Sequence, residues 1–307
     1  MTNVGPASPD RPGRAVLRGL LDLRPSVGAG PGAAAAEAAA QVLPAAKVYE
    51  FASADYPGAA QSDVFDTDGT TTVGAFVFDP SSASSPTTAF TFAGGVYQIL
   101  AVPGSTASIA TGINPAGLIV GVYADLANMM HGFTGSGDTF SNLDFPGASG
   151  TQAIGVNHAG HIVGSYFDAA NVEHGFVSSG GTFTALNFPG ATSTAAAGIN
   201  TSGDIVGVWS DATGTHGFLL KAGVFTPVNF PLAIDTTAFG INDAGEIAGF
   251  YSDTAGNTHG FIYASGAFSA VDVAGARSTQ LTRIKNGGPI TGVCSDAVTG
   301  IHGLIGR

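Results

Sequence analysis

One tripeptide returns through the C-terminal part of this 307-residue chain at a nearly constant interval. His-Gly-Phe begins at residues 131, 174, 216 and 259, and His-Gly-Leu begins at 302, so successive copies are 42 or 43 residues apart. Gly-Ile-Asn or Gly-Val-Asn keeps the same spacing, starting at 112, 155, 198 and 240. Self-similarity at such a period is typical of solenoids, propellers and other repeat architectures. The repeat therefore restricts the fold more than any other feature of the sequence.

Each repeat has the pattern of four short strands. In the copy that ends near residue 230, we expect strands at 194–200, 204–211, 215–223 and 224–230. Asn-x-x-Gly follows the first strand, an Asp-led loop the second, Gly the third and, in several copies, Pro-Gly the fourth. These residue types favour tight turns. Four strands in about 43 residues match the length of a β-propeller blade.

The two ends of the repeating region complement each other. The last copy stops at residues 302–307 and lacks a fourth strand, whereas residues 47–58 look like a fourth strand without the preceding three. A ring in which the N-terminal strand completes the last blade uses both fragments. The sequence therefore predicts an all-β fold: a six-bladed β-propeller of four-stranded blades over residues 47–307, closed by the N-terminal strand. The Gly-Ile-Asn strand is expected to be innermost, because small residues fit near a converging axis.

The repeat resembles the HAF-type extracellular repeat family, which is named for a His-Ala-Phe tripeptide. The shared features are the Ile-Asn-x-x-Gly turn, the Ile-Val-Gly strand and the His-x-Phe strand, here His-Gly-Phe, and they cover residues 48–307. The resemblance implies an extracellular or cell-surface protein. It implies no particular activity, and the N-terminus shows no clear signal peptide, because Asp22 and Arg24 interrupt its apolar patch.

Charge is distributed unevenly along the chain. Residues 1–47 hold five basic and three acidic residues, whereas the remaining 260 residues hold 5 basic and 19 acidic ones. So acidic a body argues against nucleic acid as a partner, since binding it needs a basic face. The longest apolar runs are too short for a membrane span. We expect residues 1–46 to be a flexible or docking tail in which short helices can form. Two alternatives stay open: the tail docks to a partner, a neighbouring copy or the acidic body, or it is disordered.

Five histidines and five aspartates recur at matched places. The histidines are His131, His174, His216, His259 and His302, and the aspartates are Asp125, Asp168, Asp211, Asp253 and Asp296. Each aspartate precedes its histidine by five or six residues, so we interpret them as a structural pair within each blade. Equivalent positions lie far apart around a ring, so the histidines cannot share one metal. We predict no metal site or cofactor, although calcium at the aspartate loops stays open as an alternative.

Functional residues are most easily recognised where they break the repeat. Asp66 is interpreted as replacing the turn asparagine, with Asp63 nearby, while Arg283 replaces a glycine and Lys285 an asparagine. These breaks fall in the first and last blades, which are neighbours in a closed ring. One interpretation is a salt-bridge seal at the seam. The other is a ligand-binding site in which acid and base meet a small polar molecule.

Two kinds of function are compatible with these features. The first is a non-catalytic binding or structural propeller that presents loops to a protein, a small molecule or a glycan. The alternative is a hydrolase or lyase with its site at the channel, acting on a small polar or carbohydrate substrate. Nearly uniform blades favour the first, because an enzyme needs unlike residues aimed at one point. Cys294 replaces a repeated aromatic residue and is interpreted as a packing residue.

Overall fold

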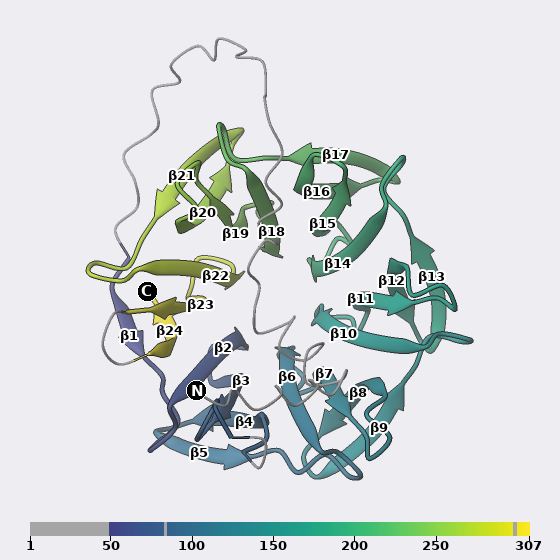
Figure 1. The fold of residues 1–307 in the computed structure, drawn as a ribbon, viewed down its shortest axis with the longest axis vertical. Helices are drawn as coiled ribbons and strands as arrows, with labels where there is room; N and C mark the ends of the chain where they lie inside the picture. The colour runs from purple at the N-terminus through teal and green to yellow at the C-terminus, as the bar shows by residue number, and fades with distance from the viewer. Residues whose placement is uncertain (1–48, 83–84, 297–299) are drawn as a thin grey trace, which may run out of the picture.

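The chain folds into a ring of β-sheets around a common centre (Figure 1), and all described strand pairs but one are antiparallel. The computed structural model describes residues 49–82, 85–296 and 300–307. The expectations about residues 1–46 therefore lie outside the described residues. No helix in the described part of the chain is long and apolar enough to cross a membrane.

Four of the sheets are separate, four-stranded blades with their strands in chain order. The first comprises β6 (Ala107–Ile113), β7 (Ile119–Ala124), β8 (Met130–Ser136) and β9 (Thr139–Leu143). The second comprises β10 (Gly150–Val156), β11 (Ile162–Phe167), β12 (Glu173–Ser179) and β13 (Thr182–Leu186). The third comprises β14 (Ser193–Ile199), β15 (Ile205–Asp211), β16 (Gly214–Lys221) and β17 (Val224–Val228). The fourth comprises β18 (Asp235–Ile241), β19 (Ile247–Ser252), β20 (Thr258–Ala264) and β21 (Ala267–Val271).

The other described strands form a single eight-stranded sheet, in the order β22-β23-β24-β2-β3-β4-β5 with β1 also paired to β24. Its strands from the start of the chain are β1 (Phe51–Ser53), β2 (Gln61–Thr67), β3 (Thr71–Val77), β4 (Thr88–Ala93) and β5 (Val96–Ile99). Its strands from the end of the chain are β22 (Ser278–Ile284), β23 (Ile290–Ser295) and β24 (Ile301–Gly306). The prediction of a six-bladed β-propeller of four-stranded blades is therefore wrong. Four blades are separate, and the remaining strands are joined into one sheet.

The joint between the two chain ends explains this difference. β1 pairs antiparallel with β24, with Phe51 opposite Gly306, and the chain then turns back so that Gln61 pairs in parallel with Ile301. The close approach requires a glycine before β24, because a Cβ on Gly300 would lie 3.0 Å from the carbonyl oxygen of Ala60. The spacing of the repeat contains no signal for this one parallel pair.

Packing inside each blade explains two repeated residues: the phenylalanine of His-Gly-Phe and the glycine of the Ile-Val-Gly strand. The phenylalanine of His-Gly-Phe is fully buried in every complete copy, at Phe133, Phe176, Phe218 and Phe261. Each lies opposite the glycine of the second strand, as Phe218 does opposite Gly207. A Cβ on Gly207 would lie 2.9 Å from the Phe218 ring, so the glycine makes room for the ring. Burying one such ring contributes about 1.5–3 kcal/mol.

The innermost strands β2, β6, β10, β14, β18 and β22 surround the centre of the ring (Figure 1). Each carries a β-bulge at the same place, for example between Ala110 and Gly112 in β6 and between Leu281 and Arg283 in β22. A bulge bends the strand and redirects its backbone. Near the centre, Phe65, Ile109, Ile154, Ala197 and Phe239 belong to one buried apolar cluster. The middle of the ring is therefore filled.

Candidate functional site

The two faces of the ring carry different parts of the repeat. Successive strands of a blade run in opposite directions, so the turns after the first and third strands open on one face. We call this the Asn-turn face, because Asn114, Asn157, Asn200 and Asn242 each follow an innermost strand. The Asp-led loops after the second strands lie on the opposite face. Candidate residues on the two faces therefore do not meet.

The turn asparagines link neighbouring blades. The side-chain amide of Asn114 donates a hydrogen bond to the carbonyl oxygen of Asn157 (3.0 Å), and Asn157 donates in the same way to Asn200 (3.0 Å). Asn200 continues the series to the carbonyl oxygen of Asn242 (3.3 Å). The carbonyl oxygen of each asparagine side chain accepts from its own turn, as Asn114 does from Ala116 and Leu118. These four buried asparagines therefore have a structural role: they hold their own turns and connect neighbouring blades.

Strand register corrects the interpretation of Asp66. In β2, Asp66 follows the bulge and pairs with Val73, as Gly112 follows its bulge and pairs with Val120. Asp66 therefore occupies the glycine position of the innermost strand, and Asp68 occupies the asparagine position. The oxygen Oδ1 of Asp68 accepts hydrogen bonds from the backbone of Thr70 and Thr71 in its turn. The misassignment arose because β2 contains no Gly-Ile-Asn to fix its alignment.

Arg283 occupies the same glycine position in β22, and its guanidinium extends into the ring. Its Nη1 donates to the carbonyl oxygens of Phe239 and Thr282, both at 2.9 Å, and its Nη2 donates to Ile154 (2.7 Å) and Thr111 (3.5 Å). These oxygens come from four different innermost strands. The guanidinium also lies over the Phe239 ring, 5.1 Å from its centroid. Arg283 thus satisfies backbone oxygens that the bulges direct toward the axis.

Glycines on two other innermost strands, β18 and β10, allow the close approach of Arg283. A Cβ on Gly240 would lie 2.7 Å from the Cα of Arg283, and a Cβ on Gly155 would lie 3.2 Å from its Nη2. Arg283 fills the centre from one innermost strand, and Asp66 is its charged partner at the same position of β2.

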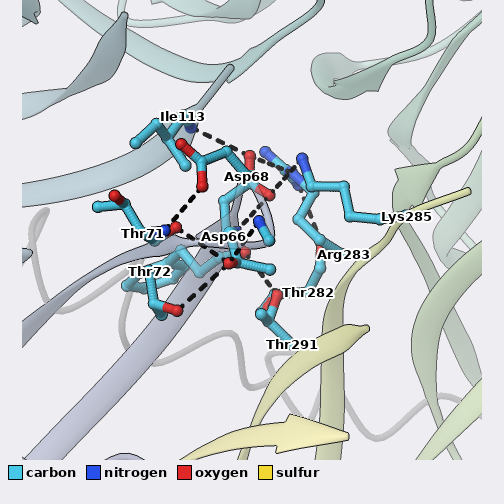
Figure 2. Close-up of polar contacts among 12 residues, drawn as sticks. Asp66, Asp68, Thr71, Thr72, Ile113, Thr282, Arg283, Lys285 and Thr291 are labelled. Atoms are coloured by element: carbon cyan, nitrogen blue, oxygen red, sulfur yellow. Dashed lines mark hydrogen bonds and ion pairs between the residues drawn. The ribbon is translucent and has the colours of Figure 1, made fainter. Parts of the chain in front are cut away.

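Asp66 joins Arg283 and Lys285 at the seam (Figure 2). Its Oδ1 lies 2.7 Å from Nζ of Lys285 and accepts from the backbone N–H of Thr67 at 2.8 Å. Its Oδ2 accepts from the backbone N–H of Ile113 at 3.1 Å and lies 3.6 Å from Nε of Arg283. Both carboxylate oxygens are therefore occupied, and Asp66 is only 1% exposed.

The electrostatics of this cluster follow from its burial. Burial lowers the pKa of Arg283, and the charge of Asp66 counteracts that effect. Burial alone raises the pKa of Asp68, but hydrogen bonds from Thr71 and Thr70 and the charge of Lys285 leave that pKa below its ordinary value. Two carboxylates thus accompany two cations, and the cluster is balanced in charge. Asp63 is buried on the other side of the bulge, opposite Ala75.

A hollow of about 150 Å³ opens at the centre of the Asn-turn face, and we call it the axial hollow. Its inner layer is an aliphatic collar made of Ile113, Val156, Ile199, Ile241 and Ile284. Its rim includes Pro115, His158, Thr201, Asp243 and Asn286. Lys285 also lines the hollow, while Arg283 lies two residues earlier in the chain, within β22. The hollow therefore combines aliphatic residues with polar groups in about equal measure.

The rim was missed by sequence reasoning. Its members follow the turn asparagine or its replacement Lys285, and they differ from repeat to repeat, whereas the asparagine itself is repeated. Variation inside an otherwise constant turn was the available signal. Asp243 is the best-held rim residue: it accepts from the backbone N–H (2.8 Å) and hydroxyl (3.0 Å) of Thr201 and from the amide of Asn286 (2.7 Å). These hydrogen bonds keep the pKa of Asp243 below its ordinary value.

The predicted histidine–aspartate pairs are present on the opposite face. The distances from Nε2 to the aspartate oxygen are 3.2 Å for His174 and 3.3 Å for His216, and 3.4–3.5 Å for His131, His259 and His302. Each histidine except His302 stacks on a residue of the second strand, as His216 does on Trp209 with centroids 4.4 Å apart. Among the described residues, no group of three or more His, Cys, Asp or Glu is placed to hold a metal ion. The pairs are part of the blade structure.

The sheets arranged around a filled centre define a β-propeller. No protein-family model matches the chain, and no curated protein sequence matches it. Among solved structures, it is similar to TolB from Acinetobacter baumannii, with a TM-score of 0.57 and 11% identity over 78% of this chain and 65% of TolB. It is also similar to AofleA from Arthrobotrys oligospora, with a TM-score of 0.54 and 12% identity over 84% and 86% of the two chains.

A third similar structure is a mutant of the Aleuria aurantia lectin in complex with Fucα1-6GlcNAc. Its TM-score is 0.50 and its identity is 10%, over 83% of this chain and 97% of the lectin. Identities this low establish the fold alone.

Proposed function

We propose that this chain is a non-catalytic binding propeller whose ligands are carbohydrates. The observation that carries the proposal is the pairing at the seam: the charged residues that depart from the repeat are bonded to one another and to the backbone. These charged residues stabilise the ring, and the polar groups on the rim of the axial hollow are suited to holding a ligand. The similarity to a lectin that binds a fucosylated disaccharide supports carbohydrate as the ligand class.

The same pairing argues against the hydrolase or lyase alternative. A glycosidase needs a carboxyl group that exchanges protons with the substrate, usually as one of a pair. Asp66 is buried, and its two oxygens already face four partners. A carboxylate enclosed in this way is not placed to exchange a proton with a substrate. Binding therefore explains the centre of the ring better than catalysis does.

An extracellular or cell-surface location is part of this proposal. It is supported by the resemblance of the repeat to the HAF-type family and by the lectin among the similar structures. Membership of the HAF-type family is likewise proposed, on the Ile-Asn-x-x-Gly and His-Gly-Phe elements.

A glycan array probed with the labelled full-length chain tests the proposed function. We expect selective capture on a subset of uncharged glycans and no change in those glycans after prolonged incubation, as followed by mass spectrometry. A bound glycan should also raise the melting temperature, because it binds only the folded state. No capture on any glycan, or cleavage of a captured one, would contradict the proposal.

A further inference from the structure

We propose that the axial hollow is the ligand site and that it takes one uncharged, polyhydroxylated six-membered ring of an oligosaccharide. This inference rests on the proposed function and names the site and the part of the ligand that it recognises. The hollow lies on the axis, so the turns of several blades contribute to it at once. The residue after the turn asparagine or its replacement Lys285 also differs in each of the five repeats that line it.

The size of the hollow suits a single ring. Its volume is about 150 Å³. A protein cavity of roughly this volume holds one benzene molecule, so a six-membered ring has the right scale. Its floor is filled, because Arg283 and the buried apolar cluster around Phe239 occupy the centre below it. A ligand therefore enters from the Asn-turn face and stops at the collar.

Charge favours a neutral ligand. The described body is strongly acidic, with 19 acidic and 5 basic residues after position 47, so it repels an anion. The cation nearest the hollow, Lys285, is already bonded to Asp66 at 2.7 Å and lies near Asp68. On the other side, the carboxylate of Asp243 is already held by Thr201 and Asn286. Lys285 and Asp243 are therefore both already paired, and neither is left to bind a ligand of opposite charge.

The rim can still recognise hydroxyl groups. Oδ1 of Asp243 keeps a lone pair after accepting from the backbone of Thr201, whereas Oδ2 already accepts from the Thr201 hydroxyl and from Asn286. The side-chain amide of Asn286 keeps a second N–H. Because Asp243 is fixed by three hydrogen bonds, it accepts from a ligand without first losing side-chain freedom. His158 acts on Asp243 electrostatically and adds a ring nitrogen to the rim. Vicinal hydroxyls, which both donate and accept, match this set.

The collar suits the other surface of a sugar ring. Five aliphatic residues, four isoleucines and a valine, line the hollow, and their side chains also pack into the buried clusters of the ring. The C–H face of a pyranose is apolar and gains by leaving water for such a surface. Apolar walls with a few placed polar groups are typical of small-molecule sites.

The test uses the full-length chain and a panel of methyl glycosides of glucose, galactose, mannose and N-acetylglucosamine, with glucuronate as the charged counterpart. Binding is measured by isothermal titration calorimetry. We expect at least one neutral glycoside to bind and glucuronate to bind at least tenfold more weakly. We expect Asp243→Ala to weaken binding of that glycoside at least tenfold.

Asp138→Ala is the matched control. It removes an exposed carboxylate from a turn on the same face, between β8 and β9, away from the axis, and it should leave binding unchanged. Melting temperatures of both variants check that the fold is intact, and Asn286→Ala, which removes the second support of Asp243, should repeat the loss. Array-positive glycans that bind both rim variants normally would overturn this inference while leaving the proposed function standing. A chain that captures no glycan overturns both.

Discussion

Arg283 and Asp66 occupy the same position in two neighbouring innermost strands, and Nε of one lies 3.6 Å from Oδ2 of the other. In the other innermost strands this position is glycine, at Gly112, Gly155, Gly198 and Gly240. The pair therefore lies where the first and last parts of the chain meet. A mutation of either residue should therefore change both the charge balance at the centre and the stability of the joint between the chain ends.

Replacing Arg283 with methionine should lower the free energy of unfolding by about 3–5 kcal/mol, because it leaves Asp66 without one partner and several carbonyl oxygens without a donor. Adding Asp66→Asn should cost much less than it does alone, since the two residues act together. Urea unfolding of the two single variants and the double variant measures the coupling. The exposed Arg277→Met is the control and should stay within about 0.5 kcal/mol of the parent chain. Strict additivity at the seam would contradict the pairing.

Removing residues 1–60 should destabilise the ring, whereas removing residues 1–46 should leave it folded. The longer truncation deletes β1 and with it Phe51, which packs against a buried cluster that contains Leu281 and Ile290. It also exposes the edge of β24, and an unpaired edge favours aggregation. Thermal unfolding and size-exclusion chromatography distinguish the two outcomes. Equal melting temperatures for both truncations would mean that β1 contributes little to the joint.

His259 should stabilise the fold more in acid than in alkali. Burial lowers its pKa, but the hydrogen bonds and charges of Asp272 and Asp253, which face its two ring nitrogens, leave the pKa raised. The stabilisation is therefore fully present below the unfolded pKa of about 6.5 and is lost as pH rises through the higher folded pKa. The difference in unfolding free energy between the parent chain and His259→Gln should therefore be larger at about pH 5.5, below the unfolded pKa, than at about pH 8.5, well above it. A difference independent of pH would show that the two carboxylates do not stabilise the imidazolium.

Asp253 should remain ionised at a lower pH than an ordinary aspartate. Hydrogen bonds from the side chain and backbone of Asn257 lower the pKa of Asp253 to about 2. Its stabilising effect is present above the unfolded pKa of about 3.9 and is lost as pH falls through the folded value. Carboxyl-carbon NMR titration should place the midpoint near 2, and Asn257→Ala should move it upward. A midpoint at the ordinary value in the parent chain would contradict these contacts.

Much of each blade could be predicted from the sequence because its determinants are local. The spacing of Gly-Ile-Asn and His-Gly-Phe places four strands in each repeat, and the pairing of Gly207 with Phe218 follows once those strands form a sheet. The pairs of loop aspartate and histidine lie five or six residues apart, so turn geometry alone brings them together. Periodicity also indicated the innermost strand, where small residues recur.

Contacts between distant residues were decided by the tertiary structure. The parallel pair Gln61–Ile301 merges the chain ends into an eight-stranded sheet, and it joins residues 240 positions apart that have no shared local pattern. The position of Asp66 depended on a bulge, and one extra residue changes which side chain faces the axis. The axial hollow exists only because turns from separate blades converge. The sequence by itself determined the strands and turns of each repeat, because neighbouring residues specify them. The closed ring determined which residues meet at its centre, because packing brings distant strands together on one axis.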